Sequence, residues 1–433
     1  MYAGLSFHNT SYAMVLFGDE PLSDPRDEKT PLPCVTAIIA TYNRARYLGR
    51  AIESVLDQSL RPTQVIVVDD GSTDSTSEVL ERFDGKVVAI RKSNGGKASA
   101  LNLGLTQATG DLIWIFDDDD LALPDCLQTL ATALIRHPEC GFAFGAYDHL
   151  IESKDGTTEV VQPRLLIDRS IDPKLAILER CFIFQPGLLV RKACYDALGP
   201  FNEAQVRSQD YEMLLRLSRR YDGIDVGRVV FHQRQHAGAR GSAASPVSGA
   251  KKDAGWIQYD RMMFSKIYED YTLPEYLPGR LPPHAPLTPD RKAAALLQRS
   301  CVMARKGLWT YAAADLKSFS AHRLAQRERG LTALESATLK RFFGPYSYAD
   351  HTLTQSEVFF SCLAEDMPRS MRWRVTKALL SPWRAELMYS LRGFHGRYFL
   401  GTVRKIVRFL LLLLRAHRRH PSSVSSIMGT DSQ

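Results

Sequence analysis

Four consecutive aspartates occupy positions 117–120, directly after the apolar segment Leu112–Phe116. Adjacent negative charges at the end of a buried strand repel one another, so the compact state needs a compensating positive charge. Mg²⁺ and Mn²⁺ bind carboxylate oxygens and often share their coordination with a substrate phosphate. The run is also compatible with an acidic surface turn, or with a capping cluster for the helix expected from about Pro124. It is therefore a candidate metal site that depends on its neighbours.

The chain around this run alternates between short apolar stretches and stretches whose apolar residues recur at helical spacing. The pattern predicts strands at 35–40, 65–68, 87–90 and 112–116, with a helix after each of the first three. Strands that alternate with helices imply crossover connections, so the expected fold class is α/β, with a mainly parallel sheet flanked by helices.

Three of the predicted strands end in polar residues that can bind a metal ion or a nucleotide. They are Thr41–Asn43, Asp69–Asp70 and Asp117–Asp119. Ligands of parallel sheets bind at the carboxyl ends of the strands, which meet at one edge. We therefore expect these residues to converge, which favours a ligand site over an isolated acidic turn.

The composition is that of a globular protein: 433 residues, 45% hydrophobic and 24% charged. This length suits one large domain of about 200–250 residues and a smaller one. Seven scattered cysteines without a CxxC pair favour reduced thiols over a disulfide framework or a zinc site. The first 30 residues lack a basic segment followed by an apolar core, so no signal peptide is expected.

Four segments of the chain, in order, resemble motifs of the family 2 glycosyltransferases, which have the GT-A fold. They are 35–44, 67–74, 94–102 and 116–120. A fifth, 208–217, resembles the segment that presents the catalytic carboxylate of this family. The resemblance covers about residues 33–241, and five motifs in the family's order make it specific. It implies a donor that is a nucleoside-diphosphate sugar.

The resemblance implies a role for several strand-end residues in nucleotide binding. Thr41, Asn43 and Asp70 correspond to the nucleotide site, where Asp70 accepts hydrogen bonds from the base. Lys97, in a glycine-rich turn that opens a helix, corresponds to a phosphate contact. Asp70 is also compatible with a helix N-cap, and Lys97 with a solvated surface lysine.

The acidic run matches the Asp-x-Asp motif of the family through Asp117 and Asp119. The resemblance implies that Asp119 contacts Mg²⁺ or Mn²⁺ directly, and that Asp117 lies near the ribose or the water shell of the metal. The cation would bridge the two phosphates of the donor and stabilise the leaving group. Asp118 and Asp120 are expected to orient the loop or to cap the next helix.

Residues 234–236 resemble the family's Arg-x-His segment, which implies that His236 binds the metal or the diphosphate as a neutral imidazole. A surface or core histidine is the alternative. The Gly/Ala/Ser-rich stretch 237–250 that follows is expected to close over bound nucleotide.

Asp210 falls on the position of the family's general base, which takes the proton of the acceptor hydroxyl and predicts inversion at the anomeric carbon. The family usually has Glu before this Asp, whereas Gln209 stands here. A helix N-cap is the alternative for Asp210. The chain lacks the Gln-x-x-Arg-Trp motif of processive synthases, so a non-processive enzyme is expected.

The C-terminal part is strongly basic. Residues 369–419 contain thirteen Lys or Arg and one acid, Glu386. Within them, 401–418 places apolar residues along one side of a helix and basic residues on the remainder, which predicts binding to an anionic membrane surface. Packing on the chain's own body or on a partner is the alternative, and nucleic acid is not an expected partner. No apolar run approaches the roughly 18–20 residues that span a bilayer.

Changes in pattern divide the chain into four predicted parts. They are a poorly ordered lead-in (1–32), a GT-A glycosyltransferase domain (33–250), a helical domain (251–366) and a basic amphipathic tail (367–433). The predicted location is cytoplasmic, peripheral on the inner face of the cell membrane.

The function expected is inverting, metal-assisted transfer of a sugar to a hydroxyl of a saccharide or lipid-linked acceptor, in surface-polysaccharide assembly. A nucleotide-sugar binding protein with little turnover is the alternative. A nucleotidyltransferase is disfavoured, because it needs a glycine-rich basic loop where Thr41–Arg44 stands.

Overall fold

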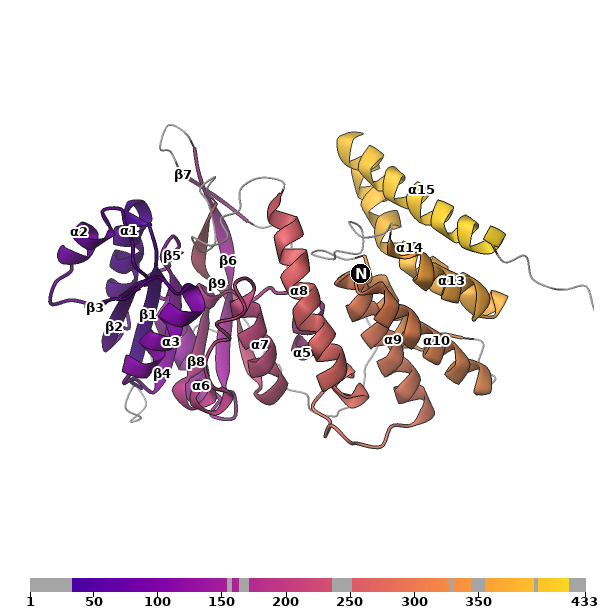
Figure 1. The fold of residues 1–433 in the computed structure, drawn as a ribbon, viewed down its shortest axis with the longest axis horizontal. Helices are drawn as coiled ribbons and strands as arrows, with labels where there is room; N and C mark the ends of the chain where they lie inside the picture. Colours follow the sequence, from indigo (N-terminus) through magenta and orange to yellow (C-terminus); the bar gives the residue numbers. More distant parts are fainter. Residues whose placement is uncertain are drawn as a thin grey trace, which may run out of the picture. The chain divides into compact units, whose positions relative to one another are not determined.

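The computed structural model describes seven stretches of the chain, and the lead-in 1–32 lies outside them. They are 33–153, 158–162, 171–235, 251–326, 330–343, 355–392 and 396–419. The chain divides into two compact units, Met1–Trp256 and Ile257–Gln433. Figure 1 shows the α/β character of the first unit and the helical character of the second.

The first half of the sheet is parallel. Its strands are β1 (Val35–Thr41), β2 (Gln64–Asp69), β3 (Val88–Arg91) and β4 (Leu112–Asp117), in the order β3-β2-β1-β4. The cores of β1, β2 and β4 are continuous apolar runs because both faces of the sheet are covered. In the register of the sheet Thr41 pairs with Asp69, and Ala40 pairs with Asp117. The polar strand ends therefore meet at one edge, as the sequence predicts.

The helices that connect these strands are α1 (Ala45–Leu56), α2 (Thr76–Glu81) and α3 (Lys97–Gln107). The apolar stripe of α1 is buried against the main core of the unit. Helix α3 packs on β1 and β2, and Gly104 permits this close approach. A Cβ atom at Gly104 would lie 2.6 Å from Cγ2 of Ile38.

The second half of the sheet mixes both pairings. β8 (Leu188–Arg191) pairs antiparallel with β4 and with β6 (Phe142–Glu152), and β9 (Gly223–Gln235) runs parallel to β6. β5 (Leu121–Ala122) pairs antiparallel with β9, and β7 (Thr158–Val161) pairs antiparallel with β6. The expected α/β fold class is confirmed, with the consecutive parallel strands confined to one half. The later part of β6 is only partly buried and lacks a continuous apolar run.

Four further helices pack around this half of the sheet. They are α4 (Cys126–Arg136), α5 (Pro173–Glu179), α6 (Lys192–Leu198) and α7 (Gln209–Arg220). α7 packs against α5 and α6, and its apolar side includes Met213, Leu214 and Leu217, all buried.

The second unit is helical among its described residues. It contains most of α8 (Lys251–Asp270), η3 (Leu273–Tyr276), α9 (Pro289–Arg305), α10 (Trp309–Ala325), α11 (Ala333–Lys340), α13 (Glu357–Glu365), α14 (Arg369–Arg392) and α15 (Gly396–Arg419). Helices α9 and α10 pack together, and Gly307 between them has φ +72°.

An aromatic cluster forms the centre of this unit. Phe343 stacks on Trp383 of α14 with ring centroids 4.1 Å apart, and Phe409 of α15 meets Phe360 of α13 edge-on at 5.2 Å. Such pairs stabilise a core beyond the area they bury. Both Trp383 and Phe409 are buried. Residues of the predicted basic tail thus contribute to the core of the helical unit.

Candidate active site

The end of β4 and the start of α3 are joined by an ion pair. Lys97 Nζ lies 2.6 Å from Asp117 Oδ1. Burial acts to lower the pKa of Lys97, but Asp117, Asp210 and Asp118 together raise it above its ordinary value. Lys97 therefore keeps its positive charge among three carboxylates.

Asp118 and Asp119 face a second cation, Arg44. Arg44 Nε lies 3.9 Å from Asp118 Oδ1, and Nη2 lies 4.0 Å from Asp119 Oδ2. Burial and the neighbouring charge of Asp119 nevertheless raise the pKa of Asp118 to about 7, with Arg44 acting in the opposite direction. Arg44 thus offsets only part of the negative charge of Asp118 and Asp119. Arg44 was not among the predicted site residues, although its place directly after Asn43 was a usable signal.

Asp120 has a different role from its neighbours. It is buried, and its Oδ1 accepts a hydrogen bond from the backbone N–H of Arg234 at 2.9 Å. Arg234 Nε in turn donates to the backbone carbonyl of Asp119 at 2.9 Å. These bonds attach the end of β9 to the acidic run, which agrees with the loop-orienting role expected for Asp120. Arg234 is another residue that sequence reasoning did not single out beyond its motif.

Asp70 organises the glycine-rich turn before α3. Its Oδ1 accepts from Gly95 N–H and from Lys92 Nζ, both at 2.9 Å, and its Oδ2 accepts from Gly96 N–H at 2.7 Å. The turn needs Gly96, whose φ is +89°. Carboxylate oxygens can accept further hydrogen bonds, so contact with a base remains chemically open to Asp70. Lys92 had no predicted role.

Asn43 connects the end of β1 to the turn that follows β2. Its Oδ1 accepts from Thr73 N–H at 2.7 Å and Asp74 N–H at 3.3 Å, and its own N–H donates to Ser72 Oγ at 2.9 Å. The structure thus gives Asn43 a turn-forming role, and its contact with nucleotide stays a prediction.

Thr41, at the end of β1, carries a buried polar atom. Its Oγ1 lacks a hydrogen-bond partner of normal geometry among the described residues, although the hydroxyl is close enough to Asp118 to lower the pKa of that carboxyl. Buried hydroxyls are usually paired, so an unpaired one beside an acidic cluster is suited to a ligand.

Asp210 lies at the start of α7, and its Oδ1 accepts from Tyr211 N–H at 2.9 Å. Burial raises the pKa of Asp210, Lys97 lowers it and Asp117 raises it. The side chain keeps some exposure to solvent. A carboxylate with a raised pKa and access to solvent is suited to accept a proton. The helix start is anchored by the Tyr211 hydroxyl, which donates to the carbonyl of Ile177 at 2.6 Å.

Backbone strain occurs next to these residues. Among the described part of the chain, the non-glycine residues with positive φ are Asn43 at +54° and Ser208 at +56°. Asparagine tolerates this conformation, whereas serine adopts it at a cost. Strained residues are frequent at functional sites; Asn43 is itself a predicted site residue, and Ser208 lies two positions before Asp210.

The structure brings most of the predicted residues together. Thr41, Lys97, Asp117, Asp119 and Asp210 share one charged cluster, and Asn43 and Asp70 organise the adjoining turns. His236 and the loop 237–250 lie outside the described residues, so their roles stay predictions.

A divalent cation at this cluster would be held by carboxylate oxygens. The described residues include no group of three or more His, Cys, Asp or Glu arranged to hold a metal ion. Mg²⁺ commonly binds one or two carboxylates and takes its other ligands from water and substrate phosphates. The burial and the neighbouring charge of Asp119 that raise the pKa of Asp118, together with the buried Thr41 hydroxyl, are compatible with such a site.

Fold and site together define an α/β domain whose charged residues gather at the carboxyl edge of parallel strands, where sheets of this kind bind ligands. Residues 36–185 match the family model described as "Glycosyl transferase family 2".

Curated relatives of this chain are described as glycosyltransferases. An uncharacterized glycosyltransferase of Nostoc sp. is 32% identical over 186 residues, which cover 40% of this chain and 55% of that protein. An uncharacterized glycosyltransferase of Rickettsia felis is 30% identical over 191 residues, which cover 43% of this chain and 32% of that protein. Glycosyltransferase GlyG of Streptococcus pneumoniae serotype 4 is 32% identical over 123 residues, which cover 28% of this chain and 40% of that protein. The chain thus spans only part of the length of these relatives.

Two solved structures show a distant similarity. S. aureus TarS 1–349 in complex with UDP-GlcNAc has a TM-score of 0.46 and 17% identity, over 76% of this chain and 91% of that one. The mannosyltransferase PcManGT from Pyrobaculum calidifontis, in complex with GDP-Man and Mn²⁺, has a TM-score of 0.43 and 20% identity, over 82% of this chain and 88% of that one. Similarity at this level supports no argument about ligands.

Proposed function

We propose that this chain is an inverting, non-processive glycosyltransferase that moves a sugar from a nucleoside-diphosphate donor to a hydroxyl of a saccharide or lipid-linked acceptor. The observation that carries the proposal is the electrostatic contact of Asp210 with Lys97 and Asp117. It supports the assignment of Asp210 as a proton acceptor beside a charged cluster. Surface-polysaccharide assembly is the proposed process.

Asp210 is the general base of the proposed reaction. One of its carboxylate oxygens accepts the proton of the acceptor hydroxyl as that oxygen attacks the anomeric carbon. The bond from the anomeric carbon to the diphosphate oxygen breaks on the opposite face, and its electron pair leaves with the nucleoside diphosphate. Attack opposite the leaving group inverts the configuration.

The donor is held at the other side of the cluster. Thr41, Asn43 and Asp70 bind the nucleoside, and Lys97 places its positive charge toward the phosphates. Asp119 would bind Mg²⁺ or Mn²⁺, with His236 as a further ligand and Asp117 near the ribose or the water shell of the cation. The cation, when bound, supplies positive charge that stabilises the departing diphosphate.

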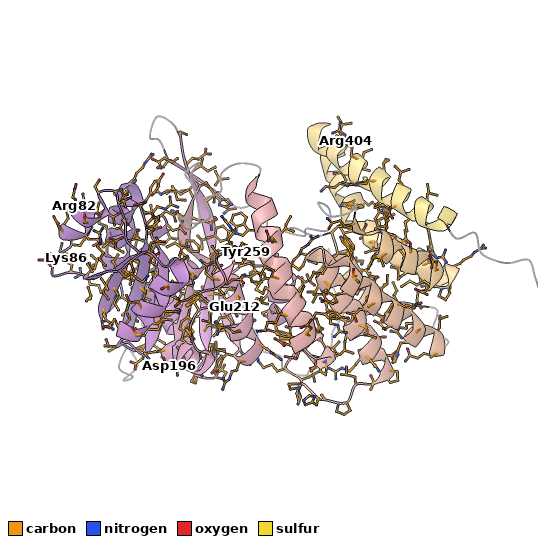
Figure 2. The ribbon with its side chains drawn as sticks, viewed as in Figure 1. Arg82, Lys86, Asp196, Glu212, Tyr259 and Arg404 are labelled. Carbon is orange, nitrogen blue, oxygen red and sulfur yellow. The ribbon has the colours of Figure 1, made fainter. Side chains whose placement is uncertain are left out.

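The first test measures nucleotide and metal binding by thermal unfolding. The full chain is melted with UDP, GDP, ADP, CDP or TDP, each with and without Mn²⁺. A ligand at about 100 times its Kd adds about 2.7 kcal/mol of stability and raises the Tm by about 5–10 °C. We expect one diphosphate to act only with Mn²⁺, and Asp119→Ala to abolish the shift. Asp196→Ala is the control, because Asp196 is an exposed carboxylate at the foot of the domain in the view of Figure 2.

The second test separates turnover from binding. Asp210→Asn keeps the size of the side chain but cannot accept the proton, so it should retain the nucleotide shift and lose transfer from the matching nucleotide sugar. Equal turnover in Asp210→Asn and wild type would overturn the assignment of the base. A nucleotide shift without transfer by any variant would favour the binding-protein alternative, and no shift under any condition would refute the nucleotide site.

A further inference from the structure

Helix α15 is apolar on two sides, and one side belongs to the core of the helical unit. Thr402, Phe409 and Leu412 are buried, and α15 packs against α13 and α14. The Phe409 ring lies 5.6 Å from the Trp383 ring and 5.7 Å from that of Phe343. The orientation of α15 about its own axis is therefore set by the core of this unit.

The opposite side of α15 carries a strip of large apolar side chains, here named the outer strip. Its members are between 41% and 57% exposed: Leu400, Val407, Leu410, Leu411 and Leu414. Their spacing places them along one face of the helix. Large apolar side chains that gather on an exposed face mark an interaction surface. Here no described residue covers the outer strip.

The surface beside the outer strip is basic. Arg404 and Arg408 are both exposed and lie one turn apart, and Arg404 is within four positions of Leu400 and three of Val407. Figure 2 labels Arg404 near the start of α15. Helix α14, which packs on α15, also carries the exposed residues Arg369, Arg374, Lys377 and Arg384 and an exposed Trp373. The only acid in residues 369–419 is Glu386.

We propose that the outer strip lies flat in the surface of an anionic lipid bilayer. The leucine and valine side chains enter the boundary between headgroups and acyl chains, and the guanidinium groups of Arg404 and Arg408 bind lipid phosphates. Such a helix lies on the membrane without crossing it. No helix among the described residues is long and apolar enough to span a bilayer.

Charge distinguishes the bilayer from a second copy of this chain. Two copies joined through the outer strip would bring two basic surfaces together, and these repel at the ionic strength of a cell. An anionic surface instead attracts the same residues. Membrane binding does not depend on sugar transfer. The consequence that α15 carries the enzyme to a lipid-linked acceptor does rest on the proposed function.

The test is flotation of the full chain with vesicles of phosphatidylcholine alone, or of phosphatidylcholine with phosphatidylglycerol. Wild type should float with phosphatidylglycerol, less so at high salt, and should stay in solution with phosphatidylcholine alone. The triple variant Val407→Asn/Leu411→Asn/Leu414→Asn should not float. The control Met262→Asn/Leu324→Asn changes exposed apolar residues on α8 and α10, and should float like wild type.

The charge contribution is tested by Arg404→Gln/Arg408→Gln. Each basic residue near an anionic surface is worth about fivefold in partitioning, so the double variant should partition about 20- to 30-fold less. The control is Arg291→Gln/Lys292→Gln, which removes two exposed charges at the start of α9. All variants should keep the melting temperature and the nucleotide shift of wild type, which separates this proposal from that of the active site.

Three outcomes would overturn the proposal. The first is failure of wild type to float with anionic vesicles at low salt, and the second is flotation of the triple variant to the same extent as wild type. The third is a concentration-dependent dimer in light scattering that the triple variant abolishes, without vesicle binding. In that case the outer strip is an interface between copies of the chain.

Discussion

Lys97 Nζ lies 2.6 Å from Asp117 Oδ1 and thereby joins the first residue of α3 to the last residue of β4. The same lysine lowers the pKa of Asp210, which follows 113 positions later in the chain. One ammonium group therefore interacts with both the acidic run and the proposed base. Four predictions follow from this cluster and from the turns that hold it.

Removing the charge of Lys97 should change the pH dependence of sugar transfer. Lys97 lowers the pKa of Asp210, so Lys97→Gln should raise that pKa. A general base works in its deprotonated form, hence the acid side of the kcat/KM profile should move to higher pH. The profile is measured with the donor identified by the nucleotide panel. Lys192→Gln, which breaks an exposed pair with Asp196, is the control and should leave the profile in place. An unmoved acid limb in Lys97→Gln would contradict the coupling.

The stability of the metal-free protein should depend on the protonation of Asp118. Its pKa is raised from 3.8 to about 7 on folding, so the folded state holds a proton that the unfolded chain has released. The free energy of unfolding should therefore decrease as pH rises from about 4 to about 7. Asp118→Asn should weaken this dependence and be the more stable protein above about pH 7.

Urea denaturation with a chelator, at about pH 5 and about pH 8, measures this difference. Asp84→Asn changes an exposed carboxyl in the turn after α2, and should follow wild type at both values. An Asp118→Asn variant that loses stability in parallel with wild type would show that Asp118 does not titrate in this range.

Asp70→Asn should destabilise the turn before α3. The carboxylate accepts hydrogen bonds from Gly95, Gly96 and Lys92, whereas an amide would oppose an N–H₂ donor to at least one of them. An unsatisfied buried donor costs about 1–3 kcal/mol, which urea denaturation can measure. The control is Asp196→Asn, which changes a carboxyl at an exposed site. Glu179 is buried, so Glu179→Gln cannot serve as the control. Wild-type stability in Asp70→Asn would contradict the observed hydrogen bonds.

Ser208 should tolerate glycine and reject a β-branched residue. Its φ of +56° is accessible to glycine but costly for valine, by about 1–3 kcal/mol. Ser208→Val should therefore lower the free energy of unfolding by that amount, and Ser208→Gly, the matched control, by less than about 1 kcal/mol. If the two variants unfold at the same urea concentration, the left-handed conformation at Ser208 is not required.

The sequence alone predicts the parts of this protein that depend on local patterns. Apolar runs and helical spacing indicate β1, β2 and β4, and their alternation with helices implies that Thr41, Asp69 and Asp117 end at one edge. The acidic run is visible for the same reason, because its four charges are adjacent in the chain.

Tertiary structure alone decides which charges meet. The ion pairs of Arg44 with Asp118 and Asp119, and the attachment of Arg234 to Asp120, join residues that are far apart in the chain. The two faces of α15 are another case, since its apolar residues look alike in sequence, and only packing determines that Phe409 is buried while Leu411 is exposed. Side-chain periodicity reports the local environment of a segment. The partner of each side chain depends on strand register and helix packing, which act between segments distant in sequence.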